Sequence, residues 1–82
     1  MPTGEQIHAA RAMLNWSMQE LANRAGCSWR TIRRAEEAGA TVPRMHVSTL
    51  ERITAVLEAA GIAFIGQDQR SESGGRGIRW RQ

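Results

Sequence analysis

The stretch LANRAGCSWRTIRRAE, residues 21–36, contains two short helical patterns on either side of a glycine. The first pattern places apolar residues such as Leu21 and Ala25 at helical spacing. Gly26 follows it, and glycine commonly ends a helix because it enters a left-handed turn without strain. Ser28, two residues later, is a preferred N-cap residue. The sequence therefore predicts two short helices that meet across a tight turn.

The length of this turn, about three or four residues, is typical of a helix-turn-helix connection. We expect the helix after the turn to extend from about Trp29 to Ala38, where Gly39 stops it. At 100° per residue, one face of this helix is small or apolar apart from one glutamate, and the opposite face is charged. The inward face consists of Ser28, Ile32, Ala35 and Glu36. The outward face consists of Arg30, Arg33, Arg34 and Glu37.

The arginines of the outward face are spaced three and four residues apart. Like charges at these spacings disfavour an isolated helix by about 0.2–0.5 kcal/mol per pair. A solvated face is the ordinary explanation for a run of charges. Here a negatively charged partner explains the arrangement better, because phosphates and guanine edges would compensate the repulsion.

Three Ser/Thr-x-x-Glu/Gln patterns resemble capping boxes and predict where other helices begin. They are Thr3–Gln6, Ser17–Glu20 and Ser48–Glu51. The first helix is expected from about Glu5 to Asn15. The fourth follows Ser48 and ends at Gly61, with an apolar stripe formed by Leu50, Ile53, Leu57 and Ala60.

The remainder of the chain has a different character. Residues 62–65, IAFI, have the composition of a strand, and residues 77–81, GIRWR, alternate apolar and basic side chains as a half-buried strand does. Two strands alone are marginally stable in water. They need to pack on the helices or to pair with a second chain. We therefore divide the sequence into a helical domain, 1–61, and a β tail, 62–82, as a possible dimerisation element.

Composition excludes several classes of protein. The 82 residues carry a formal net charge of +3 and a pI of about 11.0, which permits nucleic acid as a partner without requiring it. No apolar stretch approaches the roughly 20 residues of a membrane span, and no signal peptide opens the chain, so we expect a cytoplasmic protein. Cys27, the single cysteine, cannot form an intrachain disulfide. A structural role for it in the turn is favoured over a redox switch.

The sequence also lacks the motifs of common enzymes. It contains no HExxH helix, no GxxxxGKS/T phosphate loop and no supported Ser/His/Asp set. No cluster of Cys and His residues has metal-ligand spacing. We expect no enzymatic activity, no metal and no cofactor.

The motif as a whole resembles the DNA-binding core of the lambda-repressor-like (Xre/Cro) family. The matching residues are Leu21, Ala22, Gly26, Ser28, Thr31, Ile32 and Glu36, and the resemblance covers about residues 5–60. It implies a mainly α fold, a four-helix lambda-repressor-like helix-turn-helix domain, here followed by a short C-terminal strand pair. The family often has a fifth helix, which the tail replaces in this chain.

The resemblance also implies the roles of individual residues. The third helix of such domains lies in the major groove, and the second crosses the phosphate backbone. Positions that face bases are occupied by Trp29, Arg30 and Arg34, and Arg33 belongs to the same outward face. Positions near phosphates are occupied by Ser17, Gln19 and Arg44. Ser28 and Thr31 stand where the family contacts phosphate or caps the helix. Arg11 and Glu36 stand where a buried, structural ion pair is common.

Two features leave alternatives open. Trp29 either contacts a thymine methyl or sugar edge, or covers the junction between the helices. Met18 occupies the place of a usual glutamine contact in helix two, a role that Gln19 is able to take.

These observations predict a sequence-specific transcriptional regulator that binds double-stranded DNA as a homodimer. The alternative is the antitoxin of a toxin–antitoxin pair, which binds a small protein partner as well as its own promoter. A stoichiometric partner in co-purification would favour the antitoxin.

Overall fold

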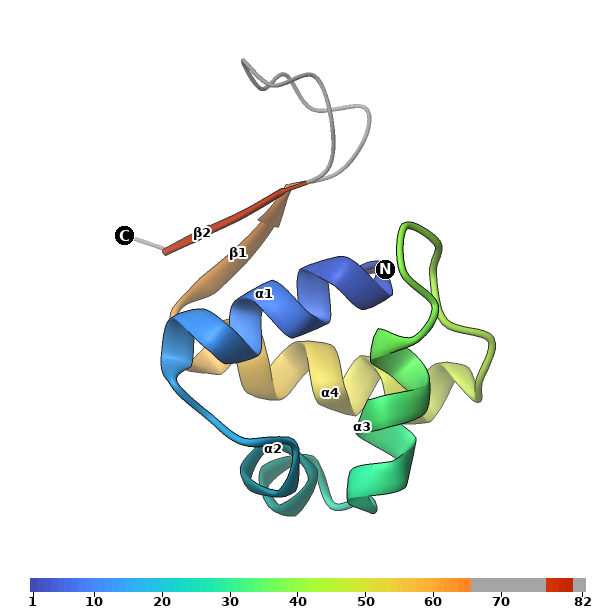
Figure 1. Ribbon diagram of the computed structural model, residues 1–82. Coiled ribbons are helices and arrows are strands. Elements are labelled where there is room, and N and C mark those ends of the chain that lie inside the picture. Colours follow the sequence, from blue (N-terminus) through green and yellow to red (C-terminus); the bar gives the residue numbers. More distant parts are fainter. Residues whose placement is uncertain (66–76, 81–82) are drawn as a thin grey trace.

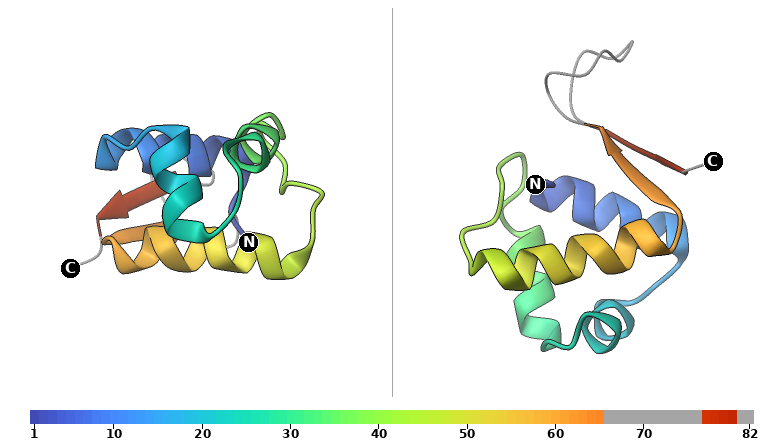
Figure 2. Two further views of the ribbon diagram at one scale, coloured as in Figure 1. Left: turned by 90° about the horizontal axis from the view of Figure 1, so that it is seen from below. Right: turned by 180° about the vertical axis from the view of Figure 1, so that it is seen from behind.

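The computed structural model of the protein describes residues 1–65 and 77–80. Its elements are α1 (Gly4–Leu14), α2 (Met18–Ala25), α3 (Trp29–Glu36), α4 (Val47–Ala59), β1 (Ile62–Ile65) and β2 (Gly77–Trp80). α1 and α4 lie side by side; α2 and α3 pack on one side of this pair, and the two strands lie on the other (Figure 1, Figure 2). The prediction of four helices followed by a short strand pair is confirmed.

The turn between α2 and α3 is built by the residues that predicted it. Gly26 adopts a left-handed conformation with φ of 71°, and the N–H of Cys27 donates to the carbonyl of Ala22 over 3.0 Å. The hydroxyl of Ser28 then accepts from the N–H of Thr31, which caps α3. These local bonds fix the angle at which α3 leaves α2.

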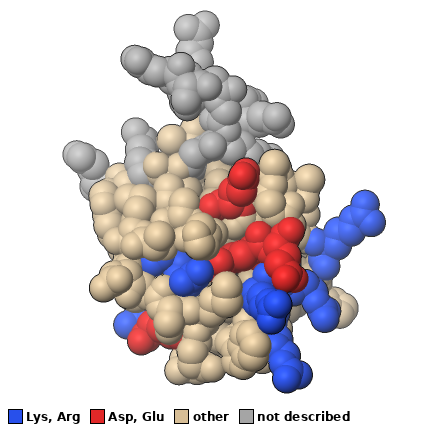
Figure 3. Space-filling model, in the orientation of Figure 1, with Lys and Arg blue, Asp and Glu red and all other residues tan. Residues whose placement is uncertain are grey.

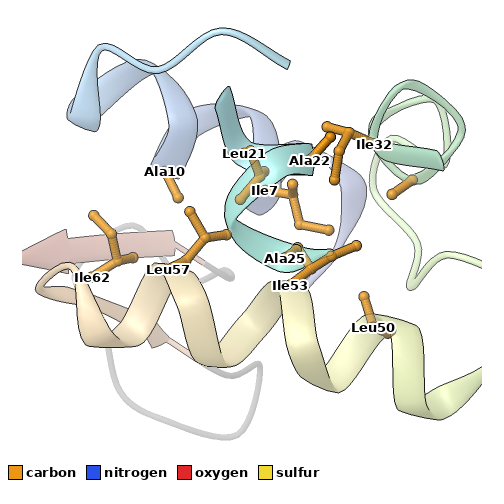
Figure 4. Close-up of a cluster of buried hydrophobic side chains, with 11 residues drawn as sticks. Ile7, Ala10, Leu21, Ala22, Ala25, Ile32, Leu50, Ile53, Leu57 and Ile62 are labelled. Carbon is orange, nitrogen blue, oxygen red and sulfur yellow. The ribbon is translucent and has the colours of Figure 1, made fainter. Parts of the chain in front are cut away.

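All four helices and β1 contribute to one hydrophobic core. Its buried members are Ile7, Ala10, Leu21, Ala22, Ala25, Ile32, Ala35, Leu50, Ile53, Leu57 and Ile62 (Figure 4). Ile32 of α3 and Leu21 of α2 are fully buried, so the hydrophobic effect holds the charged helix firmly against the rest of the domain. The outward face of α3 is thereby presented to solvent in a fixed orientation.

The strands form an antiparallel pair within one chain, in which Ile62 faces Trp80 and Phe64 faces Ile78. Ile62 is fully buried, and Phe64 and Ile78 pack against the core. Gln6 of α1 also donates its side-chain N–H to the carbonyl of Ile65 over 3.0 Å. The tail is therefore attached to the helices by both apolar and polar contacts.

Two helix boundaries differ from the sequence-based expectations. The predicted capping box of Ser48 and Glu51 is wrong, because α4 begins at Val47 and Ser48 already lies inside it. His46 is the N-cap: its carbonyl accepts from the N–H groups of Thr49 and Leu50, and no side chain caps the helix. α3 ends at Glu36 rather than near residue 38, because the backbone tightens there into bonds between residues three apart.

The start of α1 is joined directly to the end of α3. The N–H groups of Gly4 and Glu5 donate to the carbonyls of Thr41 and Gly39 over 3.1 and 2.9 Å. Gly4 is also packed against the last backbone carbonyls of α3. Because the first N–H groups of a helix have no partner within it, the loop after α3 supplies the acceptors that α1 needs.

None of the helices in residues 1–65 and 77–80 is long and apolar enough to span a bilayer.

Candidate nucleic-acid interface

An exposed groove of about 400 Å³ lies between the start of α3, the loop that follows α3, and the start of α4. Three arginines line it, Arg30 and Arg34 from α3 and Arg44 from the loop. Hydroxyl groups of Ser28, Thr31 and Thr49 line it as well, and no carboxylate of the described residues does. The groove thus combines positive charge with hydrogen-bond donors, the chemistry that binds phosphate.

The predicted site residues Ser28 and Thr31 have a structural task in this groove. The two hydroxyls lie 3.0 Å apart, and Ser28 caps the first turn of α3. Arg34 and Arg44, in contrast, form no ion pair within the described residues, and both are exposed. Their guanidinium groups remain available to an anion.

The outermost side of α3 is mixed in charge. Arg33 lies 3.5 Å from Glu37 in an i,i+4 ion pair. The guanidinium carbon of Arg30 lies 5.7 Å from the ring centroid of Trp29, within the range of a cation–π contact. Trp29 is 40% exposed, so its ring is partly open to solvent at the start of α3. Acidic and basic side chains therefore lie next to each other here, and Figure 3 shows side chains of both kinds side by side on the face that it draws.

The predicted site residues of α2 stand apart from the groove. Ser17 caps α2 by accepting from the N–H of Glu20, and Gln19 donates to the side chain of Asn23 over 2.8 Å. Both side chains are exposed on the helix that precedes the turn. The structure therefore brings Arg30, Arg34 and Arg44 together in one groove, while Ser17 and Gln19 occupy the neighbouring helix.

Arg11 and Glu36 form a two-point ion pair that joins α1 to α3. Arg11 Nε and Nη2 lie 2.8 and 2.9 Å from the two carboxylate oxygens, and the side chains are only 15% and 7% exposed. The hydrogen bond with Glu36 raises the pKa of Arg11 above its usual value, against the opposing effect of burial. Arg11 also donates to the carbonyl of Trp16, and Nδ1 of exposed His8 lies 3.0 Å from Glu36. The pair positions the arginine-bearing helix and leaves its outward face unaffected.

Sequence reasoning missed Arg52. On α4, its Nε donates over 3.2 Å to the carbonyl of Ala25, in the last turn of α2. The two residues are 27 positions apart, so no local pattern signals this contact. His46 and Thr49 were also missed as groove residues; their nearness to Arg44 in the chain was the available signal.

Cys27 is one of the residues that line the groove. Burial raises the pKa of its thiol, and the charge of Arg52 only partly opposes this. A thiol that stays protonated is a poor nucleophile, which favours the structural role for Cys27 over a redox switch. Within the described part of the chain, no three His, Cys, Asp or Glu side chains gather as metal ligands would.

Comparisons with known proteins bear on the fold. No family model matches the chain, and no curated protein matches it. One similar solved structure is a complex of the SinR protein and the SinI protein, with a TM-score of 0.57 and 30% sequence identity. The match covers 70% of this chain and 53% of that chain, so this chain spans about half of the length of the protein that it matches. The likeness confirms the lambda-repressor-like helix-turn-helix fold.

Proposed function

We propose that this protein is a transcriptional regulator that binds specific sequences in double-stranded DNA through α3. The observation that carries the proposal is the convergence of Arg30, Arg34 and Arg44 on one exposed groove, which no carboxylate in the described part of the chain lines. The repressor-like fold supports it, because helix-turn-helix domains present the second helix of the motif to the major groove. In this protein that helix is α3.

In the proposed complex, the first turns of α3 enter the major groove. Arg34 and Arg30 donate to guanine O6 and N7, the commonest specific contact that arginine makes there. Trp29 holds the guanidinium of Arg30 beside its ring and meets a thymine methyl or sugar edge. Phosphates along one edge of the DNA major groove bind Arg44, Ser28 and Thr31. Phosphates along the other edge of the major groove bind Ser17 and Gln19 of α2.

Replacement of Arg34 by alanine is expected to weaken binding to the preferred duplex by about 1–3 kcal/mol and to relax selectivity at one base pair. The preferred duplex is obtained by selection from a random pool, and affinities are measured for all four bases at each position. Arg24→Ala is the matched control, because it removes an equal charge from α2, where Arg24 pairs with Glu20 and lies over Trp16. Equal losses of affinity and selectivity in the two variants would contradict the assignment of Arg34.

Replacement of Arg44 by alanine is expected to weaken binding to every duplex alike. Because a phosphate contact releases about one counterion, the slope of log K against log salt should fall by about one unit. A titration series over salt concentration measures this slope. A loss confined to one sequence would show that Arg44 reads a base instead.

The proposal includes a homodimer. Such domains read two half-sites about one helical turn apart, and the strand pair offers a second surface on the side of the molecule opposite α2 and α3. Trp80 is 49% exposed on this sheet, which has only two strands within the described residues. Sedimentation equilibrium of the intact chain measures the oligomeric state, and palindromy of the selected duplexes reports it independently. Deleting the tail is unsuitable, since Ile62 belongs to the core.

A protein partner is a second candidate role. The similar solved structure is a complex of two proteins, SinR and SinI, so a chain that contains a domain of this fold is found in a complex with another protein. An antitoxin would use the domain both to bind its own promoter and to bind a protein partner. Co-purification of a small protein at a fixed stoichiometry is the test.

A further inference from the structure

Glu37 is a carboxylate placed beside the arginines that we propose to meet DNA. It follows α3 directly, its side chain is 63% exposed, and its Oε2 lies 3.5 Å from Nε of Arg33, which is 60% exposed. It is therefore in solvent and on the same side of the helix as the arginine that it pairs with. Among the arginines of α3 in the described structure, Arg33 alone is paired with a carboxylate.

Glu37 differs from its neighbour Glu36, which is needed for the fold. Glu36 is buried and holds Arg11 at two points, whereas the Glu37 pair is long, single and solvent-exposed. Exposed pairs of this kind contribute little to stability. A contribution to stability therefore does not explain why a carboxylate stands beside this arginine.

Any anion that approaches Arg33 also meets the charge of Glu37. Its charge lies well within the Debye length, about 10 Å at 0.1 M salt, of any phosphate that Arg33 could contact. It repels that phosphate and competes with it for the guanidinium of Arg33. A neutral side chain at this position would leave Arg33 available for one more sequence-independent contact.

We propose that Glu37 limits the binding of this protein to DNA of any sequence by occupying Arg33. This inference rests on the proposed DNA-binding function and adds a residue that sets its strength. Such a limit is useful because a genome offers a large excess of non-specific sites that compete for the protein.

The test is the variant Glu37→Gln, which keeps the shape of the side chain and removes its charge. The variant should bind the selected duplex and scrambled duplexes more tightly by a similar factor. The salt slope should steepen by about 0.9, so the ratio of affinities at 50 and 200 mM salt should rise about threefold to fourfold. Fluorescence anisotropy with labelled duplexes over a salt series gives both quantities.

Two further variants isolate the cause. Glu58→Gln makes the same change of net charge at an exposed site near the other end of α4, and it should leave the slope unchanged. In an Arg33→Gln background, Glu37→Gln should no longer steepen the slope, because its effect acts through Arg33. Circular dichroism melting curves check that all variants remain folded.

The possible outcomes separate this inference from the function on which it rests. If the parent protein shows no salt-sensitive binding to any duplex, the proposed function fails and the role of Glu37 fails with it. If the parent binds DNA but the salt slope of Glu37→Gln equals that of the parent, only the role of Glu37 is overturned. The same holds if Glu37→Gln and Glu58→Gln have equal salt slopes. A gain confined to one base pair also overturns it, since Glu37 would then read a base.

Discussion

Replacing Glu36 by glutamine is expected to lower the free energy of unfolding by about 2–3 kcal/mol. Loss of one partner from a buried ion pair typically costs about 3–5 kcal/mol, because the other charge stays buried without compensation. The expected loss is smaller here, because Arg11 is partly exposed to solvent and keeps its hydrogen bond to the carbonyl of Trp16. Urea denaturation followed by circular dichroism measures the difference.

The matched control for Glu36 is the next residue in the chain. Glu37→Gln makes the same chemical change in an exposed pair, and it should alter the free energy of unfolding by no more than about 0.5 kcal/mol. Similar losses in the two variants would mean that the joint between α1 and α3 does not depend on the buried pair.

Replacing Gly4 by alanine is expected to destabilise the protein by about 3 kcal/mol, although alanine favours helices. A Cβ atom at this position would lie 2.5 Å from the carbonyl oxygen of Ala35, 2.7 Å from that of Glu36 and 2.8 Å from the amide nitrogen of Gly39. All three atoms belong to the backbone, so no side chain is able to move aside. Overpacking of a close contact costs about 1–3 kcal/mol, and here α1 must also move away from α3.

Gly26→Ala is the control for this substitution. Gly26 has positive φ but open space around its Cα, so alanine there meets only the cost of the left-handed conformation, about 1–2 kcal/mol. Thermal melts of the two variants under one condition rank them. A larger loss at Gly26 than at Gly4 would show that conformation, and not the approach of α1 to α3, dominates.

The part of the fold that could be predicted is the part with local causes. Gly26 and Ser28 mark the turn because each has its own backbone requirement, a left-handed conformation and an N-cap. The predicted start of α4 was wrong: Ser48 has the right chemistry for a cap, but the N-cap is His46, two residues earlier, and no side chain caps the helix. Gly4 gave no signal, since the atoms that exclude a Cβ there come from residues 35–39.

In the candidate site, too, the residues placed by a local pattern could be predicted from the sequence, and those placed by the path of the chain could not. Helical periodicity placed Arg30 and Arg34 on one side of α3, and the structure brings both into the groove. Arg44 was identified through the family resemblance, because its position depends on how the loop returns to α4. That these residues bind DNA stays a prediction, and so does the role of Trp29. The strand predicted over residues 77–81 is tested only at residues 77–80, because residues 66–76 and 81–82 and the side chain of Arg79 lie outside what the structure describes.

The side chain of Gln6 links the start of α1 to the end of β1. Its side-chain oxygen accepts from the backbone of Thr3 at the helix start, and its nitrogen donates to Ile65 at the end of the strand. Because the side chain is buried, separation of the strand would deprive an interior donor of this acceptor. We therefore expect local opening of β1 to be coupled to fraying of the first turn of α1, and the two segments should share a single protection level in hydrogen exchange.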